Sequence, residues 1–356
     1  MIPLNIHKIH KIHKKRIDRD EALNLFKDND LLKIGKIADA LRKEKHSDGI
    51  VTFIIDRNIN YTNICSSQCK FCAFYKNRND DGAYILNIHE IFKKIEETIE
   101  LGGTQILIQG GLNKDIAFDY YIDLLSAIKQ NFDIHIHGFS PPEIYFMAEN
   151  NNLTIKETIA LLKEAGLESI PGGGAEILVD RVRTKISPNK IGRDKWLEVM
   201  ETAHNEGLNS SATMMFGTVE TDEEIIEHLF KLRELQDRTG GFRAFIPWSF
   251  QSRNTKLNPR NTYGHYYLKV LSISRIVLDN FDNIQASWVT QGAKMAQAAL
   301  SFGANDLGST MIEENVVKAA GTCNPMVEEN EMVNMIKDAG FTPAQRLNDY
   351  TIIKYY

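Results

Sequence analysis

The chain has 356 residues, of which 43% are hydrophobic and 25% are charged, an ordinary composition for a globular protein that buries a sizeable core. Its formal net charge of -5 at pH 7 gives no reason to expect nucleic acid as a partner. No stretch approaches the ~18 consecutive apolar residues of a membrane-spanning helix, and the N-terminus carries no apolar run of signal-peptide length. We therefore expect a cytoplasmic protein that does not insert into membranes.

The first 48 residues are predicted to be a helical extension. Apolar side chains recur at helical spacing in residues 18–46. Residues 6–15 repeat Ile-His-Lys, and we interpret this repeat as a solvated basic tail rather than as a metal site made of its histidines. Residues 49–356 show no linker, so we expect them to form one domain that ends in C-terminal helices.

Short apolar segments alternate with amphipathic helices from residue 50 onward. Capping boxes predict that helices begin after Asn87, Thr154 and Thr221, since each has a glutamate three residues later. The expected strands are 51–55, 105–109, 134–137, 168–170, 211–216, 242–246, 284–288 and a weak one near 306. About eight strand–helix units in one direction are typical of an α/β fold of the (β/α)8 TIM-type barrel class.

Alternation along these strands predicts a polar barrel interior. Isoleucines occupy the positions that suit the helix side, which sends the intervening polar residues inward. The side chains expected to face the lumen are Gln105, Leu107, Gln109, His135, His137, Ser211, Thr213, Gln285 and Ser287. An ordinary closed barrel is filled with Val, Ile and Leu, so a polar interior indicates a lumen that holds a polar ligand.

Three cysteines follow the first expected strand. Cys65, Cys69 and Cys72 are separated by three and then two residues, so one short loop presents three thiolates to one iron–sulfur cube. A cube held this way keeps one iron open to a small molecule. A zinc site usually needs a fourth ligand, and none follows nearby in the sequence. Disulfides would leave one clustered thiol unpaired, because the remaining cysteine, Cys323, is distant and has no ligand spacing around it.

Two glycine turns follow later strands of the predicted barrel. Gly110 and Gly111 come directly after Gln109, and residues 171–176 contain three glycines followed by Ala175 and Glu176. Glycine lets backbone approach a ligand closely. The second run lacks the Lys-Ser/Thr of a phosphate-binding loop, so we interpret it as backbone that lines a ligand site. Glu176 is then a candidate to hydrogen-bond a ribose, and an ordinary turn with an exposed carboxylate is the alternative.

Other polar residues near the expected strand ends have structural alternatives. Ser140, with Pro141, Pro142 and Glu143, fits the start of a helix. One of Arg181 and Arg183 is a candidate partner for a ligand carboxylate, although a solvated helix face explains both residues nearly as well.

The cysteine spacing, with Phe71 directly before the third cysteine, resembles the signature of the radical S-adenosylmethionine (SAM) superfamily. The resemblance implies a 4Fe–4S cluster on the three cysteines, SAM bound at its open iron, and cleavage of SAM to a 5′-deoxyadenosyl radical. The glycine pair after the second strand resembles the motif that holds the SAM amino group. The residues expected to bind the cofactor are Phe71, Gln109, Gly110, Gly111, Ser140, Glu176 and Thr213.

Longer strings narrow the resemblance within the superfamily. Residues 56–63, 170–178, 286–292 and 308–315 look like the menaquinone-related branch. Together with shorter strings, they are similar to the cyclic dehypoxanthinylfutalosine synthases, the cyclases of the futalosine route to menaquinone. Two relatives share much of this pattern: aminofutalosine synthase and the ring-forming radical SAM subunit of deazaflavin synthesis.

This resemblance implies a reaction and its partners. The 5′-deoxyadenosyl radical takes hydrogen from C4′ of the substrate's sugar, the new radical closes a ring onto the benzoate, and loss of a proton and an electron restores aromaticity. His137 and Glu176 are the candidate bases. The expected partners are a nucleoside-derived small molecule and a low-potential electron donor such as flavodoxin or ferredoxin. The non-enzyme alternative is an iron–sulfur electron carrier or redox sensor, which needs neither an open iron nor a polar barrel.

Overall fold

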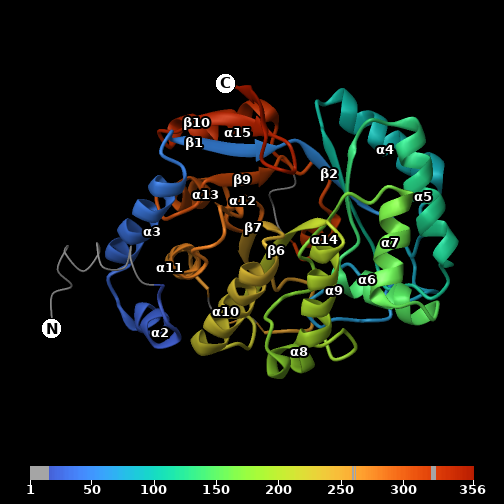
Figure 1. Cartoon of the computed structure of the whole chain (residues 1–356), viewed down its shortest axis with the longest axis horizontal. Helices are drawn as coiled ribbons and strands as arrows, with labels where there is room; N and C mark the ends of the chain where they lie inside the picture. The colour runs from blue at the N-terminus through green and yellow to red at the C-terminus, as the bar shows by residue number, and fades with distance from the viewer. Residues whose placement is uncertain (1–15, 259, 261, 322–325) are drawn as a thin grey trace.

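The computed structural model describes residues 16–258, 260, 262–321 and 326–356, and Figure 1 shows their arrangement. The Ile-His-Lys repeat and Cys323 lie outside the described residues. None of the helices within these ranges is long and apolar enough to cross a membrane.

A curved sheet of seven parallel strands, in sequence order, forms most of the barrel wall. Its strands are β2 (Asp56–Asn60), β3 (Gln105–Gln109), β4 (His135–Gly138), β5 (Ser169–Ile170), β6 (Asn209–Phe216), β7 (Phe242–Ser249) and β8 (Asn283–Ile284). The next strand, β9 (Asp306–Ser309), is joined to the end of β8 by a parallel bridge between Gln285 and Asp306. It also pairs with β1 (Ile50–Ile54), which leads directly into β2 and so completes the ring. The predicted (β/α)8 barrel class is confirmed.

The first expected strand, 51–55, corresponds to β1, and it is followed by a second strand, β2, that the sequence analysis did not predict. β1 pairs with β9 and with a C-terminal strand, and the chain then changes partner at Ile55, so that β2 pairs with β3. The sequence of β2, Asp-Arg-Asn-Ile-Asn, gave no strand signal because Asp and Asn are rare in strands. Asp56, Asn58 and Asn60 are nevertheless buried, since these alternate side chains face the barrel lumen.

Helices cover the outside of the ring, as Figure 1 shows. They are α4 (Ile88–Glu100), α5 (Phe118–Asn131), α6 (Pro141–Asn150), α7 (Ile155–Ala165), α8 (Asp180–Ile186), α9 (Arg193–Asn205), α10 (Asp222–Thr239), α11 (Gly264–Val277) and α13 (Ala293–Leu300). The three capping boxes are confirmed: at α4, for example, Asn87 N donates to Glu90 at 2.8 Å and Glu90 N to Asn87 at 3.1 Å. Ile106, Ile108 and Ile136 are fully buried on the side away from the lumen, as the alternation predicted.

Two terminal segments extend the barrel. The predicted helical stretch 18–46 is two helices, α2 (Arg19–Lys27) and α3 (Leu31–Lys45), because Asp30 caps a new helix. The helix α3 packs on α11. It also approaches the turn after α13, where a Cβ on Gly35 would lie 2.5 Å from the ring of Phe302. At the other end, α14 (Asn315–Ala319) and α15 (Glu329–Asp338) precede the strands β10 (Thr342–Arg346) and β11 (Ile352–Tyr355). These two strands were not anticipated, since Pro and Ala in β10 weaken any strand pattern.

A second difference lies at the expected strand 284–288. β8 ends at Ile284, and residues from Trp288 form the short helix α12 (Trp288–Gln291). The indole of Trp288 donates to Ser309 O at 2.9 Å, which holds this helix against β9.

Candidate active site

A cavity of about 430 Å³ occupies the barrel lumen, and the cysteine loop forms part of its lining. Of the nine side chains predicted to face the lumen, eight line it: Gln105, Leu107, Gln109, His137, Ser211, Thr213, Gln285 and Ser287. His135 does not, because it lies at the start of β4. There its Nε2 is 2.7 Å from the Ser169 hydroxyl, which also lies 2.7 Å from Nδ1 of His137.

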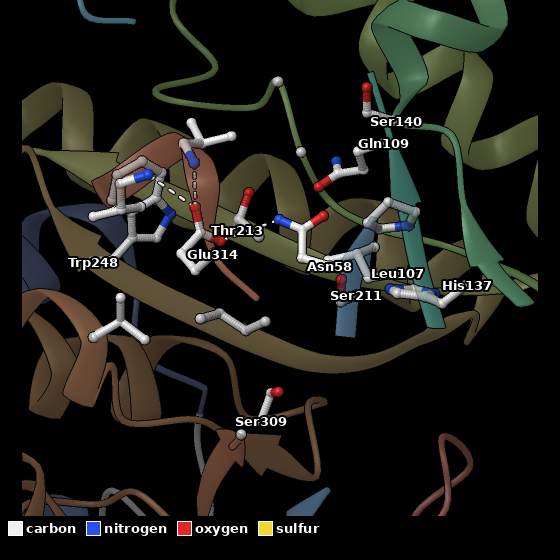
Figure 2. Close-up of a pocket in the computed structure, with 18 of the residues that line it drawn as sticks. Asn58, Leu107, Gln109, His137, Ser140, Ser211, Thr213, Trp248, Ser309 and Glu314 are labelled. Atoms are coloured by element: carbon white, nitrogen blue, oxygen red, sulfur yellow. Dashed lines mark hydrogen bonds between the residues drawn. The ribbon is translucent and has the colours of Figure 1, made fainter. Parts of the chain in front are cut away.

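The structure brings the predicted site residues to this one cavity. Its lining includes Cys65, Phe71, Cys69, Cys72, Gln109, Gly110, Gly111, His137, Ser140, Glu176 and Thr213. Figure 2 shows several of them around the lumen, with Gln109 and Ser140 on one side of the view and Trp248 and Glu314 on the other. Of the two arginines considered, Arg181 instead forms an ion pair with Glu224.

Backbone hydrogen bonds fix the cysteine loop at the wall of the cavity. Cys65 N donates to Lys76 O at 3.1 Å, and Lys70 N donates to Ile186 O at 2.8 Å. In addition, the N–H of Leu112, just after the glycine pair, lies 3.3 Å from the Sγ of Cys65. The loop is therefore tied both to α8 and to the turn after β3.

The cysteine thiols fit an iron–sulfur cluster. All three face the cavity, with Cys69 only 5% exposed and the other two half-buried. Burial raises the pKa of Cys69 to about 11 and also raises that of Cys72. Such buried thiols become thiolates at neutral pH when a metal centre supplies the compensating positive charge. Among the described residues, the three cysteines included, no three His, Cys, Asp or Glu side chains gather as ligands of a single metal ion, whereas in a cube each cysteine binds an iron of its own.

Glycine is required at the turn after β3 because the cysteine loop passes against it. A Cβ on Gly111 would overlap the carbonyl oxygen of Ile64 and lie 2.8 Å from Cβ of Cys65. A Cβ on Gly110 would overlap the ring of Tyr61. The glycine pair therefore lets the turn and the cysteine loop share one side of the cavity.

A buried carboxylate that the sequence did not single out for the site holds this turn. Glu143 accepts hydrogen bonds from Gly110 N at 2.8 Å, from Tyr61 Oη at 2.9 Å, and from both the N–H and the hydroxyl of Ser140. Burial raises the pKa of Glu143, and these hydrogen bonds oppose that rise. The interpretation of Ser140 as the cap of α6 is confirmed. Glu143, its partner in the capping box, also connects this helix to the glycine turn.

The run 171–176 lies between two strands of the wall. Gly172 N donates to Ser211 Oγ at 3.0 Å, and Thr213 Oγ1 donates to Gly172 O at 2.6 Å. A Cβ on Gly173 would come 2.6 Å from Nε2 of Gln109. These contacts explain the glycines and place their backbone at the cavity wall.

Glu176 belongs to a buried charged group beside the cysteines. Its carboxylate lies 3.0 Å from Lys190 Nζ and 3.6 Å from Arg183 Nη1, while its Oε2 has no hydrogen-bond partner. Lys190 also lies over the ring of Phe71, 5.0 Å from its centroid. Burial alone would lower the pKa of Lys190, but the negative charges of Cys69 and Glu176 outweigh it and raise that pKa.

Three further charged residues of the cavity escaped the sequence analysis. Asp56 accepts hydrogen bonds from Gln105 at 2.6 Å and from the Ser309 hydroxyl. Arg346 forms a buried ion pair with Asp306 at 2.6 Å, and Glu314 accepts from Asn58 at 3.1 Å. Strand alternation would have placed Asp56 in the lumen had β2 been recognised; the other two come from segments without strand periodicity.

Comparison with known proteins agrees with this geometry. Residues 59–232 match the family model of the radical SAM superfamily, and residues 239–355 match a model described as the CofH/MqnC C-terminal region. Over 349 residues the chain is 44% identical to a cyclic dehypoxanthine futalosine synthase of Halalkalibacterium halodurans, covering 96% of this chain and 93% of that protein.

A relative with another printed activity is almost as similar. The chain is 43% identical over 353 residues to a 5-amino-6-(D-ribitylamino)uracil–L-tyrosine 4-hydroxyphenyl transferase of Methanocaldococcus jannaschii, covering 96% of this chain and 98% of that protein. The Streptomyces coelicolor cyclic dehypoxanthine futalosine synthase is 44% identical over 340 residues, covering 94% of this chain and 85% of that protein.

Solved structures show the same fold at low sequence identity. The FeFe-hydrogenase maturase HydG of Carboxydothermus hydrogenoformans superposes with a TM-score of 0.75 at 18% identity, over 97% of this chain and 80% of that one. Methylornithine synthase gives a TM-score of 0.73 at 16% identity, over 95% and 96%. The chain belongs to the radical SAM superfamily and is an enzyme of that class. Membership implies a 4Fe–4S cluster and SAM as cofactors.

Proposed function

We propose that this enzyme is a cyclase that converts dehypoxanthinylfutalosine into its cyclic form in menaquinone biosynthesis. The observation that carries the proposal is the 44% identity to two cyclic dehypoxanthine futalosine synthases along most of the chain. The second candidate is the transferase reaction named for the archaeal relatives, because two of them are 43% identical over 353 residues and 44% identical over 323 residues. The two reactions differ in kind, since the cyclase rearranges one molecule and the transferase joins two.

The cavity residues divide into those that would hold the cofactors and those left for substrate. Cys65, Cys69 and Cys72 would bind the cluster, and the turn at Gly110 and Gly111 would approach the amino end of SAM. When bound, these cofactors supply a 5′-deoxyadenosyl radical, which abstracts hydrogen from C4′ of the substrate's sugar.

The chain's own residues would bind and orient the cofactor and the substrate and shield the reaction from water. The glycine run 171–176 offers backbone at the wall, and Glu176, with one buried oxygen that has no hydrogen-bond partner, can accept a hydrogen bond from a ribose hydroxyl. Lys190, already paired with Glu176, supplies a cation on the cysteine side. Enclosure in the barrel keeps water away from radicals while they react. A low-potential donor such as flavodoxin or ferredoxin would deliver the electron.

The deciding experiment is anaerobic. The cluster is reconstituted, SAM, a strong reductant and dehypoxanthinylfutalosine are added, and the products are analysed by mass spectrometry. We expect 5′-deoxyadenosine together with a product two hydrogens lighter than the substrate. 5′-Deoxyadenosine with unchanged substrate would reject the cyclase, and a parallel reaction with tyrosine and 5-amino-6-ribitylaminouracil would then test the transferase. Absence of SAM cleavage by protein with an intact cluster would contradict both reactions.

A further inference from the structure

The cavity holds a carboxylate on the side away from the glycine turns. Glu314 lines the lumen and is half-buried there. Its Oε1 accepts the N–H groups of Val316 and Val317 at 2.7 and 2.8 Å, and its Oε2 accepts one hydrogen bond, from Asn58 Nδ2 at 3.1 Å. A carboxylate oxygen can accept two hydrogen bonds, so Oε2 keeps one acceptor position.

The surroundings of Glu314 suit an aromatic group. Trp248, Met311, Val316 and Val317 line the same cavity. In Figure 2 the Glu314 carboxyl points into the lumen on the side where Trp248 lies, opposite Gln109 and Ser140. Since the cofactor is expected on the cysteine and glycine side, the apolar surface beside Glu314 is left for the substrate's benzoate ring.

The other carboxyl and imidazole groups of the lumen are less suited to accept a proton. Burial lowers the pKa of His137 to about 3, which makes its ring a weak base. Glu176 is paired with Lys190 at 3.0 Å. Asp56 accepts hydrogen bonds from both Gln105 and Ser309, and the charge of Arg346 opposes the rise that burial gives its pKa. Glu143 also lines the lumen, but four donors hold its carboxylate: Gly110 N, the Tyr61 hydroxyl, and the N–H and hydroxyl of Ser140. By contrast, no cation pairs with Glu314 among the described residues, and burial raises its pKa, so its carboxylate is a stronger base than an exposed one.

We propose that Glu314 is the proton acceptor of the cyclisation, a catalytic role that rests on the proposed cyclase function. The substrate radical at C4′ forms a C–C bond to a ring carbon that still carries hydrogen. The C–H bond of that carbon then breaks, and its proton goes to Oε2 of Glu314. The bonding electron pair returns to the ring, and the surplus single electron leaves to a one-electron acceptor of the iron–sulfur class. The ring is then aromatic again.

The test compares Glu314→Gln with a matched control, Glu313→Gln. Glu313 is the neighbouring residue, but its carboxylate lies 2.6 Å from Lys94 and 3.3 Å from Arg57, outside the cavity. Both variants are assayed as reconstituted holoenzyme for 5′-deoxyadenosine and for cyclised product. A general base typically contributes ~10²–10⁴-fold, so we expect Glu314→Gln to lose at least about 100-fold in product formation. Glu314→Gln should still cleave SAM to 5′-deoxyadenosine. Glu313→Gln should cleave SAM and also form the cyclised product.

A spectroscopic readout separates proton transfer from a structural role. If the ring proton cannot leave, an organic radical should accumulate in Glu314→Gln, with an electron paramagnetic resonance signal that narrows when the substrate ring is deuterated. Product formation at the wild-type rate in Glu314→Gln would overturn the proposal, and so would parallel loss of SAM cleavage and product. If Glu314→Gln does not fold, Glu314→Asp and Glu314→Asn replace it. Glu314→Asp keeps a carboxylate and should retain part of the activity. Glu314→Asn carries an amide, and product formation at the wild-type rate in that variant would also overturn the proposal. Failure of the wild-type enzyme to cyclise the substrate would instead reject the underlying cyclase function.

Discussion

Single buried carboxylates determine how the cavity wall is assembled, and Glu143 is the clearest case. It connects three segments, because the strand-end residue Tyr61, the turn at Gly110 and the helix start at Ser140 all donate to it. A capping box predicts only the contact within α6. The two longer contacts depend on the barrel bringing β2 and β3 beside that helix, so no local sequence pattern contains them.

Replacing Glu143 should therefore loosen the site as well as the helix. In Glu143→Gln one oxygen becomes an NH2 group, which faces donors and leaves buried N–H or O–H groups unpaired. Losing hydrogen bonds to a charged group costs roughly 1.5–3 kcal/mol each, so we expect the free energy of unfolding to fall by about 3 kcal/mol. Urea unfolding measures this change, and isothermal titration should show weaker SAM binding by the holoenzyme. Glu149→Gln, at an exposed position of the same helix, is the control; an equal loss in both variants would contradict the argument.

At the scale of elements, the glycine turn after β3 and the cysteine loop have to be considered together. Their backbones approach so closely that only a residue without Cβ fits at position 111. The sequence indicates that backbone approaches another group closely at this glycine pair, but it does not identify that group, which is a loop about 46 residues earlier in the chain. The structure shows that the glycines first make room for the loop that carries the cysteines.

A Gly111→Ala substitution should displace that loop. Its Cβ meets backbone and a cysteine Cβ, neither of which can rotate away, and overpacking of this kind costs about 1–3 kcal/mol. We expect lower unfolding stability and less iron bound per protein after anaerobic reconstitution. Gly192→Ala is the matched control, because its nearest contact is an Asp180 oxygen at 3.4 Å. Full iron content in Gly111→Ala would show that the loop tolerates the shift.

The elements that sequence patterns predicted are those with regular periodicity. Hydrophobic alternation located β3, β4, β6 and β7, and it predicted residues of β3 and β6 that line the lumen and also His137 of β4. It failed for β2, where Asp and Asn suit the lumen but not a typical strand. It also failed for β10 and β11, and for Glu314 and Arg346, which reach the cavity from segments that lack strand periodicity. The division of the chain at residue 48 stays a prediction, although α3 packs directly on α11.

At the scale of the whole molecule, the fold keeps several histidines uncharged. Burial lowers the pKa of His137 and His228 to about 3 and that of His204 to about 4, from an ordinary value of 6.5. The unfolded chain therefore binds more protons than the folded one between about pH 6.5 and 4. Stability is complete above pH 6.5 and is lost as pH falls through this window. Asp56 and Glu314, whose pKa burial raises, act in the opposite direction, because the folded state holds their protons more tightly.

The contribution of one histidine to the pH dependence of stability can be isolated by comparing the wild type with a variant that lacks it. His204 lies outside the cavity, where its ring nitrogens are each 2.7 Å from the hydroxyls of Thr239 and Ser210. Each such histidine lowers the free energy of unfolding by up to about 1.4 kcal/mol per pH unit inside its window. Guanidinium unfolding of the wild type and His204→Gln at pH 7.5, 6.0 and 5.0 measures this slope. The variant should be less stable at pH 7.5, since its hydrogen bonds are imperfect, but should lose less stability on acidification. If the free energy of unfolding depended on pH equally in the wild type and the variant, the pKa of His204 would not be lowered in the fold. That result would contradict the argument from burial.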